Sequence, residues 1–534
     1  MPIHPFPRFH SGTSATRPVR DVMLCLLVPL LLLAGCGDPL PEPDPISEEA
    51  LAALPTETPL ARVDHSELTL HEPLIEFVEA LAASPRVRVD TLGTSVEGRT
   101  IPYLKIGLGE FGASREDKVL VLAYAQQHGN EPAGKEGALE LALELARGDH
   151  DELLRQVDLI LVPQVNPDGG EIHQRQNAEG VDLNRSHLIL DGPEARALRE
   201  LFHRWEPEVA VDIHEYNPWS GAWLDEGWLR LFDMQIGLPT NLNVPDDIRA
   251  LAHDGFLAFA TEALEGEGFT AHNYIVGSPE SLRWSTTNVN DGRQGLAILN
   301  TLSFIFEGKR SEPLAEDMER RAEAQRLTLE SLLRFSAENR TEILNTVRGA
   351  RERIRQGEVE DFILTMRREA GDGPLEIPVE SVRRDDDGEW VVGDTVTARI
   401  EGWMPEIVAD RVIPLPPAYL IPAGQEEVIA LLEAHQVEME ALDPDMNLTV
   451  EQLTILGFIP HDLEGMVEIP ETRAQEGSYR TVQGDVLVRT AQLRGLMVAT
   501  ALEPESMHSL LRYDRFESLA TEGPFPIFRV TALP

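Results

Sequence analysis

The chain has 534 residues, which is long enough for more than one domain. Its formal net charge is -45, its pI is about 4.6, and it contains only four lysines, Lys105, Lys118, Lys135 and Lys309. So acidic a chain is repelled by phosphate groups, which excludes nucleic acid as a partner. The acidic excess is typical of a soluble surface or a salty environment rather than of a site for a basic ligand.

The N-terminus has the pattern of an export signal. Arg17 and Arg20 precede the apolar run VMLCLLVPLLLLAGC, which is too short to predict a membrane span. The run ends in Leu33-Ala34-Gly35-Cys36, which resembles a bacterial lipobox. The resemblance implies cleavage before Cys36 and a lipid anchor on it, so residues 1–35 are predicted to be a lipoprotein signal peptide. The alternative is an incidental cysteine in an ordinary signal peptide.

Cysteine usage agrees with the lipoprotein interpretation. Cys25 lies in the segment that would be removed, so the mature chain could form no internal disulfide. Gly37 follows the anchor cysteine and Asp38 comes one place later, so the aspartate signal for inner-membrane retention is absent. We therefore expect an exported protein, anchored by lipid at the outer membrane or cell surface of a bacterium.

Residues 36–60 are rich in proline and acidic residues and are predicted to be a tether. Residues 61–340 then alternate between apolar strand patterns and helical patterns, which predicts an α/β domain with a mixed, largely parallel sheet flanked by helices. The strands are expected at 118–126, 157–167, 208–216 and 303–308, and the helices at 133–148, 193–205 and 248–268.

Residues 341–534 are predicted to form a smaller C-terminal α+β region with an accessory role. Residues 312–356, at the junction, are charged and helical, which is typical of a solvated helix face and less often of a partner-binding helix. Residues 373–403 have strand-like spacing, 416–442 predict strand, helix and strand, and 480–506 predict a strand and a helix. No internal repeat is present. Gating of a cleft, solubility and contact with a partner all remain open as its role.

A candidate metal site begins with His128 and Glu131. Both follow a hydrophobic strand, at the end where α/β folds place ligand sites, and Pro132 suits the first turn of the next helix. A loop entering a helix can aim two side chains three residues apart at one point, and zinc takes nitrogen and oxygen ligands. A lone His-x-x-Glu is weak evidence, and a surface histidine beside a first-turn glutamate is the alternative.

A third ligand candidate, His214, ends another apolar strand, VAVDIHEY, although a buried structural histidine is the alternative there. Asp212 points to the same face of that strand and could accept a hydrogen bond from a ligand, or be structural. Glu307 stands at the tip of the last apolar strand. Beside a metal, it could take a proton from water and later return it; otherwise it simply reaches solvent.

Between these positions lies NPDGGEIHQRQNAEGVDLNRSH, which contains Arg175, Asn184 and Arg185. Planar guanidinium groups suit carboxylates and oxyanions, because their donors are held in a fixed fork. A single arginine is usually a surface residue, but two with an asparagine between zinc candidates favour an anion site.

The ordered set of motifs resembles the zinc carboxypeptidase family of carboxypeptidases A and B over roughly residues 60 to 340. The matching motifs are TSVEGRTI (94–101), HGNE (128–131), NPDG (166–169), RQNAEGVDLNR (175–185), DIHEY (212–216) and FEG (306–308). The resemblance implies one Zn²⁺ per chain held by His128, Glu131 and His214, with Glu307 as general base and acid. It also implies that Arg175 stabilises the oxyanion, and that Asn184 and Arg185 bind the terminal carboxylate of a peptide substrate.

The chain departs from the family in one segment. The family has a mobile tyrosine before its last catalytic strand, whereas residues 275–306 contain none; Tyr274 lies at the edge of this segment, and Trp284 and Arg293 lie within it. None of them can be assigned the tyrosine's role. Arg293 could favour an acidic group or form a structural ion pair. An insertion at 217–232 carries Trp219, Trp223 and Trp228, which could wall the cleft or pack inside.

The sequence thus predicts a lipid-anchored zinc metallocarboxypeptidase that removes the C-terminal residue of peptides. An amidase acting on cell-wall peptides with the same site is a close alternative. A non-catalytic peptide-binding lipoprotein with the same fold is a second. A serine hydrolase is disfavoured, because the chain contains no G-x-S-x-G motif.

Overall fold

The computed structural model of the chain describes residues 45–113, 115–462 and 465–533. The predicted signal peptide and Cys36 lie outside these residues. Within the described ranges, the helices are all too short or too polar to cross a bilayer.

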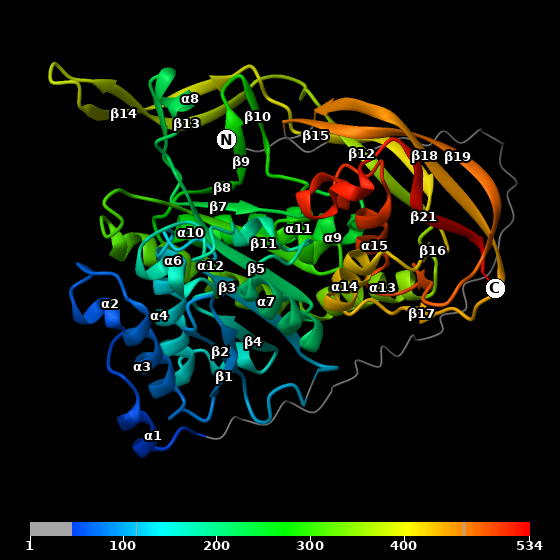
Figure 1. Cartoon of the computed structure of the whole chain (residues 1–534). Helices are drawn as coiled ribbons and strands as arrows, with labels where there is room; N and C mark the ends of the chain where they lie inside the picture. The colour runs from blue at the N-terminus through cyan, green and yellow to red at the C-terminus, as the bar shows by residue number, and fades with distance from the viewer. Residues whose placement is uncertain (1–44, 114, 463–464, 534) are drawn as a thin grey trace, which may run out of the picture. The chain divides into compact units, whose positions relative to one another are not determined.

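A mixed eight-stranded sheet is the centre of the α/β region (Figure 1). The four central strands run parallel to one another, and antiparallel pairings join them to the strands at both edges. This arrangement confirms the predicted fold class. In sheet order the strands are β1 (Val87–Thr94), β2 (Thr100–Ile106), β4 (Val157–Val162), β3 (Val119–Ala125), β5 (Val209–Tyr216), β11 (Leu302–Lys309), β7 (Met234–Gly237) and β8 (Ala271–Asn273).

Helices cover both faces of this sheet, which explains why its central strands are apolar on both faces. One face packs against α3 (His71–Leu81), α4 (Ala133–Arg147), α10 (Ala258–Gly266), α12 (Met318–Glu338) and α13 (Arg340–Arg355). The other face packs against α7 (Pro193–Trp205) and two helices of the C-terminal region, α14 (Glu426–Ala434) and α15 (Gly495–Leu502).

The C-terminal region is rich in strands, and it shares a sheet with the α/β region. Strand β6 (Trp228–Arg230) comes from the α/β region and pairs with β13 (Leu375–Arg384), which pairs with β14 (Trp390–Ile400). A separate pair joins β12 (Asp361–Glu369) and β15 (Glu406–Pro414). The largest sheet contains β17 (Glu440–Ala441), β20 (Val486–Arg489), β16 (Ala418–Ile421), β21 (Gly523–Ala532), β18 (Asn447–Asp462) and β19 (Met466–Arg480), in that order.

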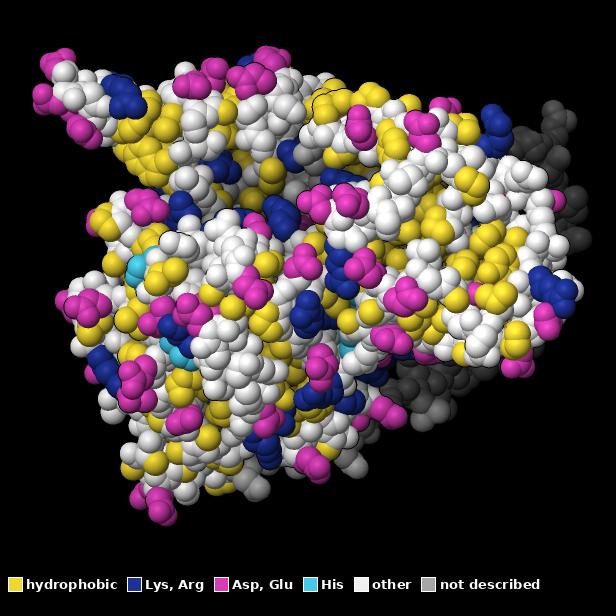
Figure 2. Space-filling model, viewed as in Figure 1, with side chains coloured by type: hydrophobic (Ala, Val, Ile, Leu, Met, Phe, Trp, Pro, Cys, Tyr) yellow, Lys and Arg dark blue, Asp and Glu magenta, His cyan; other side chains and the backbone are white. Residues whose placement is uncertain are grey.

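The surface is hollowed between the β13–β14 hairpin and the α/β region, and basic side chains gather in that hollow (Figure 2). The rest of the visible face mixes acidic, basic and apolar groups. The α/β region also contains shorter elements. They are α6 (Pro167–Glu171), the 3-10 turn Leu183–Arg185, α8 (Gly221–Asp225), β9 (Ile275–Ser278), β10 (Ser281–Trp284) and α11 (Gly292–Ala297).

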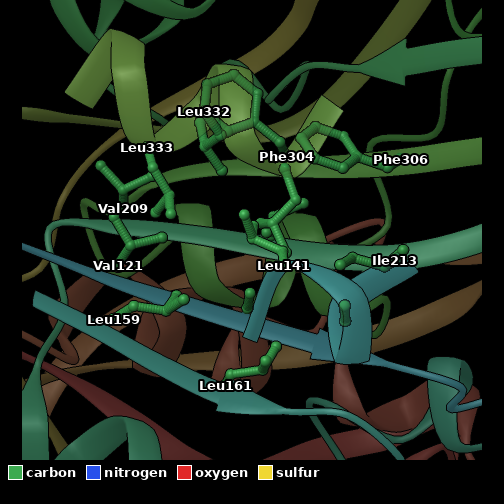
Figure 3. Close-up of a cluster of buried hydrophobic side chains, with 14 of the residues drawn as sticks. Val121, Leu141, Leu159, Leu161, Val209, Ile213, Phe304, Phe306, Leu332 and Leu333 are labelled. Carbon is green, nitrogen blue, oxygen red and sulfur yellow. The ribbon is translucent and has the colours of Figure 1, made fainter. Parts of the chain in front are cut away.

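The alternation of side chains along the central strands separates core from site. On one face Val121, Leu159, Val209 and Phe304 join the helix-covered core, which Figure 3 shows with Leu332 and Leu333 of α12. Because successive residues of a strand point to opposite faces, the positions next in register point away from that core. His214 and Glu307 are two such positions, at the carboxyl ends of β5 and β11.

Part of the predicted tether is folded. Residues 48–53 and 59–62 form the short helices α1 and α2, which Ser47 and Thr58 cap at their N-termini. Leu54 packs into the core of the α/β region, and Leu60 packs against α4 and α12. The composition of the segment, rich in proline and acidic residues, does not indicate that these two leucines are buried. Their burial holds the segment against the surface of the α/β region.

Two predicted helices are also divided. Residues 246–266 form α9 (Asp246–Ala250), a π-helical stretch from Leu251 to Leu257, and α10. The segment 312–356 contains α12 and α13, which are separated at Asn339. The predicted solvated face on α12 is partly buried, because this helix packs on α4 through Ala322 and Gln325.

Candidate active site

Three predicted metal ligands meet at the carboxyl ends of two adjacent parallel strands. His128 and Glu131 lie in the loop between β3 and α4, and His214 lies near the end of β5, which pairs directly with β3. The loop depends on Gly129, because a Cβ there would lie 2.0 Å from the backbone carbon of Gly169. A side chain at this position would displace the neighbouring NPDG turn.

The three ligand groups face one another. The Nδ1 atoms of His128 and His214 lie 3.0 Å apart, and they lie 2.9 and 2.8 Å from the two carboxylate oxygens of Glu131. All three residues are buried. One ligand atom from each can be chosen so that the three atoms lie within 4.8 Å of one another. Two imidazole nitrogens and one carboxylate form a donor set that suits zinc and leaves one position for water or substrate.

A second group of carboxylates lies behind the imidazole rings. The Nε2 atom of His128 is 3.0 Å from Oδ1 of Asp182, and Nε2 of His214 is 2.8 Å from Oδ1 of Asp212. Gln127 donates a hydrogen bond to the other oxygen of Asp212. Carboxylates at this position fix the orientation of a histidine and strengthen it as a metal ligand. Asp212 was a sequence candidate for this role. Asp182 was not, although it lies inside the DLNR motif.

The electrostatics match a site that is built for a cation. Burial would raise the pKa of Glu131, but the two histidines hold it well below its ordinary range. Burial would lower the pKa of His214, but Asp212 and Glu131 raise it well above its ordinary value. A bound metal ion would take over the positive charge that protonated histidines otherwise supply to the neighbouring carboxylates.

Glu307 lies beside the ligand group. Strand β11 pairs with β5 so that Glu307 is directly opposite His214. Burial raises the pKa of Glu307 to about 7, and the nearby Glu131 carboxylate adds to this shift. The Tyr274 hydroxyl donates a hydrogen bond to Glu307. Tyr274, which had no role in the sequence, is thus brought to the site.

The three anion-binding candidates have different surroundings. Arg175 donates from Nε to Asp182, at 2.9 Å, and its Nη1 atom lies 3.4 Å from the Glu131 carboxylate. The amide of Asn184 lies 3.1 Å from Nε2 of His214, and its oxygen accepts from the backbone of Gly292. Arg185 is exposed and bonds the carbonyl oxygen of Asn184. Arg175 and Asn184 therefore contact the ligand group, and Arg185 lines the same cleft.

A cleft of about 570 Å³ connects these groups. Of the three tryptophans in the 217–232 insertion, Trp219 lines the cleft, whereas Trp223 is buried and donates to the carbonyl oxygen of Gly277. Arg293 also lines the cleft and forms an ion pair with Asp291, at 3.2 Å.

Residues 74–203 match the family described as zinc carboxypeptidase. The chain is 28% identical over 451 residues to carboxypeptidase 2 of Trichophyton rubrum, covering 82% of this chain and 81% of that protein. It is 27% identical over 451 residues to carboxypeptidase 2 of Trichophyton tonsurans, with the same coverage. Among solved structures, a metallo-carboxypeptidase from Burkholderia cenocepacia has a TM-score of 0.41 and 23% identity, covering 51% of this chain and 70% of that one.

Proposed function

Because the chain belongs to the zinc carboxypeptidase family and is a metallopeptidase, we propose that it removes the C-terminal residue of peptides with one zinc ion per chain. The observation that carries the proposal is the meeting of His128, Glu131 and His214 in a cleft that also contains Glu307. A metal-binding group with a neighbouring buried carboxylate is the minimum equipment for metal-assisted hydrolysis.

His128, Glu131 and His214 would hold the zinc ion, and Asp182 and Asp212 would orient the two histidines. When bound, zinc supplies Lewis-acid chemistry, which polarises a carbonyl group and makes water more acidic. The remaining steps belong to side chains of this protein.

Glu307 would act as the general base. Its carboxyl group has a pKa near neutrality, so it can take a proton from the attacking water and return one to the leaving amine. The Tyr274 hydroxyl, which bonds Glu307, would hold the carboxylate in position during both transfers. This use of one carboxyl group for two proton transfers needs no further acid.

Arg175 would stabilise the oxyanion that forms at the scissile carbonyl group. It is held between Asp182 and Glu131, so its guanidinium is oriented before substrate arrives. Asn184 and Arg185 would bind the terminal carboxylate, for which a planar guanidinium is well suited. Together these residues would favour peptides that end in a free acid.

We also propose that the protein is exported and anchored by lipid on Cys36, at the outer membrane or cell surface of a bacterium. The support is the apolar run that ends in Leu33-Ala34-Gly35-Cys36 and the single cysteine of the mature chain. Residues 61–340 would form the catalytic domain, and 341–534 an accessory region. A labelled fatty acid should be incorporated by the wild-type chain and not by Cys36→Ala.

The activity is tested with purified protein that lacks the signal segment and a mixed peptide library. Each peptide is supplied with a free or an amidated C-terminus, and masses are followed with and without a chelator. Stepwise loss of C-terminal residues from the free acids alone, blocked by the chelator, is the expected result.

Two other outcomes are informative. Absence of trimming after zinc addition would contradict the carboxypeptidase proposal, and release of amino groups from cell-wall peptides would then favour an amidase. If wild type and Glu307→Gln are equally inactive but bind the same peptides, the protein is a binding protein instead.

A further inference from the structure

Arginines line the cleft, although the chain as a whole is strongly acidic. Five line it, and three of these have a carboxylate partner: Arg175 with Asp182, Arg293 with Asp291 and Arg310 with Glu312, at 2.9, 3.2 and 3.4 Å. The charges of these three are already balanced by the protein. The other two, Arg185 and Arg230, have no carboxylate partner in the described part of the chain.

Arg230 is the less expected of the two. Its guanidinium lies 4.7 Å from the centre of the Tyr216 ring and bonds the carbonyl oxygen of Asn217. Among the described residues no carboxylate forms an ion pair with it, which sets it apart from Arg293 and Arg310. Its Nε atom is buried without a hydrogen-bond partner, as are those of Arg293 and Arg310. The residue is only 9% exposed. A buried charge without a counter-ion is costly, so a group that lines an open cleft in this state points to an anionic ligand.

Strand pairing with the C-terminal region fixes the position of Arg230. Arg230 ends β6, where it pairs with Val379 of β13 in the C-terminal region. The next residue of β13, Glu380, forms an ion pair with Lys309, at 3.1 Å, which occupies its carboxylate. The C-terminal region thus fixes the backbone of Arg230, and the carboxylate of Glu380 on the paired strand is already bound by Lys309.

We infer that Arg230 is a specificity residue that binds an acidic side chain of the peptide substrate, in its last or its penultimate residue. The inference rests on the proposed carboxypeptidase function. One free guanidinium, that of Arg185, suffices for the terminal carboxylate, so the second free guanidinium matches a second carboxylate. The substrates would be peptides with aspartate or glutamate at or next to the C-terminus.

The test compares matched peptides that carry glutamate or glutamine at the last position, and a second pair that differs at the penultimate position. For each pair, kcat/KM is measured for the wild type, Arg230→Gln and Arg230→Lys. A charged hydrogen bond corresponds to roughly tenfold or more in kcat/KM, so the wild type should prefer glutamate by about that factor in one pair. The pair that responds identifies the subsite.

Arg230→Gln should lower the preference to near one while the glutamine peptides are cleaved as before, and Arg230→Lys should keep part of it. Arg310→Gln is the matched control, because Arg310 lines the same cleft but is paired with Glu312. That variant should retain the wild-type preference. Raising the salt concentration should lower the preference of the wild type and leave that of Arg230→Gln unchanged.

Three results would overturn the assignment. The first is cleavage of both wild-type pairs at equal rates, which leaves the carboxypeptidase proposal intact. The second is an unchanged glutamate preference in Arg230→Gln, which would mean that Arg230 only packs on Tyr216. The third is failure of the wild type to cleave any of the peptides, which contradicts the proposed function and this assignment with it. If Arg230→Gln does not fold, the other proteins still test the assignment. A glutamate-to-glutamine ratio of kcat/KM near one in the wild type would overturn it, and so would an Arg230→Lys ratio equal to that of the wild type.

Discussion

The two walls of the cleft are held in different ways. One wall is formed by the ends of the central strands, where His214 and Glu307 lie opposite each other in register. The other is formed by β6 and the β9–β10 hairpin, which rest on a separate apolar cluster. That cluster combines residues of the α/β region with Ile377, Val379, Ala398, Ile400 and Trp403 of the C-terminal region.

This difference between the walls suits two separate roles, in which the strand-end wall carries out the reaction and the other wall selects the substrate. The strand-end wall is fixed by the hydrogen bonds of a buried sheet and by the helices that cover it, which gives the proposed metal ligands little freedom. The second wall contains short strands, and one of them, β6, pairs with a strand from far along the chain. Substitutions in the first wall should therefore affect turnover, and substitutions under the second should affect which peptides are bound.

The largest effect should follow from loss of a metal ligand. In His128→Ala, one of the three inward-facing groups is missing, and we expect loss of bound zinc and of all peptide trimming. Zinc content is measured by mass spectrometry alongside activity. His253→Ala, at an exposed histidine on the π-helical stretch, is the control and should behave as the wild type. Full activity in His128→Ala would refute the ligand assignment.

The next largest effect should come from Glu307→Gln. The substitution keeps the shape of the side chain and removes the proton acceptor, so kcat should fall by roughly 10²–10⁴. Zinc content should not change, because Glu307 is not one of the three ligand groups. Glu312→Gln, at an exposed acid just beyond the same strand, should retain activity. A fall of less than tenfold would exclude Glu307 as the general base.

Much of the α/β region could be predicted because its signals are local. The strand VLVLAYA is apolar on both faces and the helix 133–147 has a clear period, so both were placed to within a residue or two. The long strands β18 and β19 were missed. They expose polar and apolar side chains on a twisted antiparallel pair, and the pairing that stabilises them is not visible in either segment alone.

The site shows the same limit at the level of side chains. His128, Glu131, His214 and Glu307 could be proposed because each stands at the end of an apolar run. The hydrogen bond between Tyr274 and Glu307 could not, since the residues are separated by 33 positions and meet only through β7 and β11. Motifs mark residues that chemistry requires, whereas the groups that orient them depend on tertiary packing.

A smaller effect should follow from Asp182→Asn. Asp182 contacts both Nε2 of His128 and Nε of Arg175, so its carboxylate orients a proposed metal ligand and the proposed oxyanion residue at once. We expect zinc affinity to fall by about 10- to 100-fold, and kcat at saturating zinc to fall as well, because Arg175 loses its anchor. Asp149→Asn, at an exposed position after α4, is the control. Unchanged zinc affinity would mean that Asp182 only shapes the loop.

The second wall can be loosened through Trp403. Its ring packs edge-on against Trp284 of β10, with 4.4 Å between ring centres, and the flanking backbone bonds Leu282 on the same strand. Trp403→Ala should raise KM several-fold and weaken the glutamate preference, with zinc content and kcat nearly unchanged. Trp390→Ala is a matched control, because Trp390 begins β14, the strand that precedes Trp403, and contacts Arg384 instead. A fall in kcat with no change in KM would contradict the assignment of different roles to the two walls.

The smallest effect should be a dependence of stability on pH, which distinguishes the walls without measuring activity. In metal-free protein the pKa of Glu307 is about 7, above its value of 4.5 in an unfolded chain, so the ionised group destabilises the folded state. This loss of unfolding free energy is absent below pH 4.5 and grows as the pH rises. It is complete above pH 7, where it amounts to at most about 3 kcal/mol. Glu307→Gln should therefore unfold a few degrees above the wild type at pH 8, with the difference shrinking toward pH 5. Trp403→Ala removes packing and no charge, so its loss of Tm should be the same at both pH values. If the rise in Tm of Glu307→Gln were the same at both pH values, ionisation of the buried Glu307 carboxyl group would not destabilise the fold.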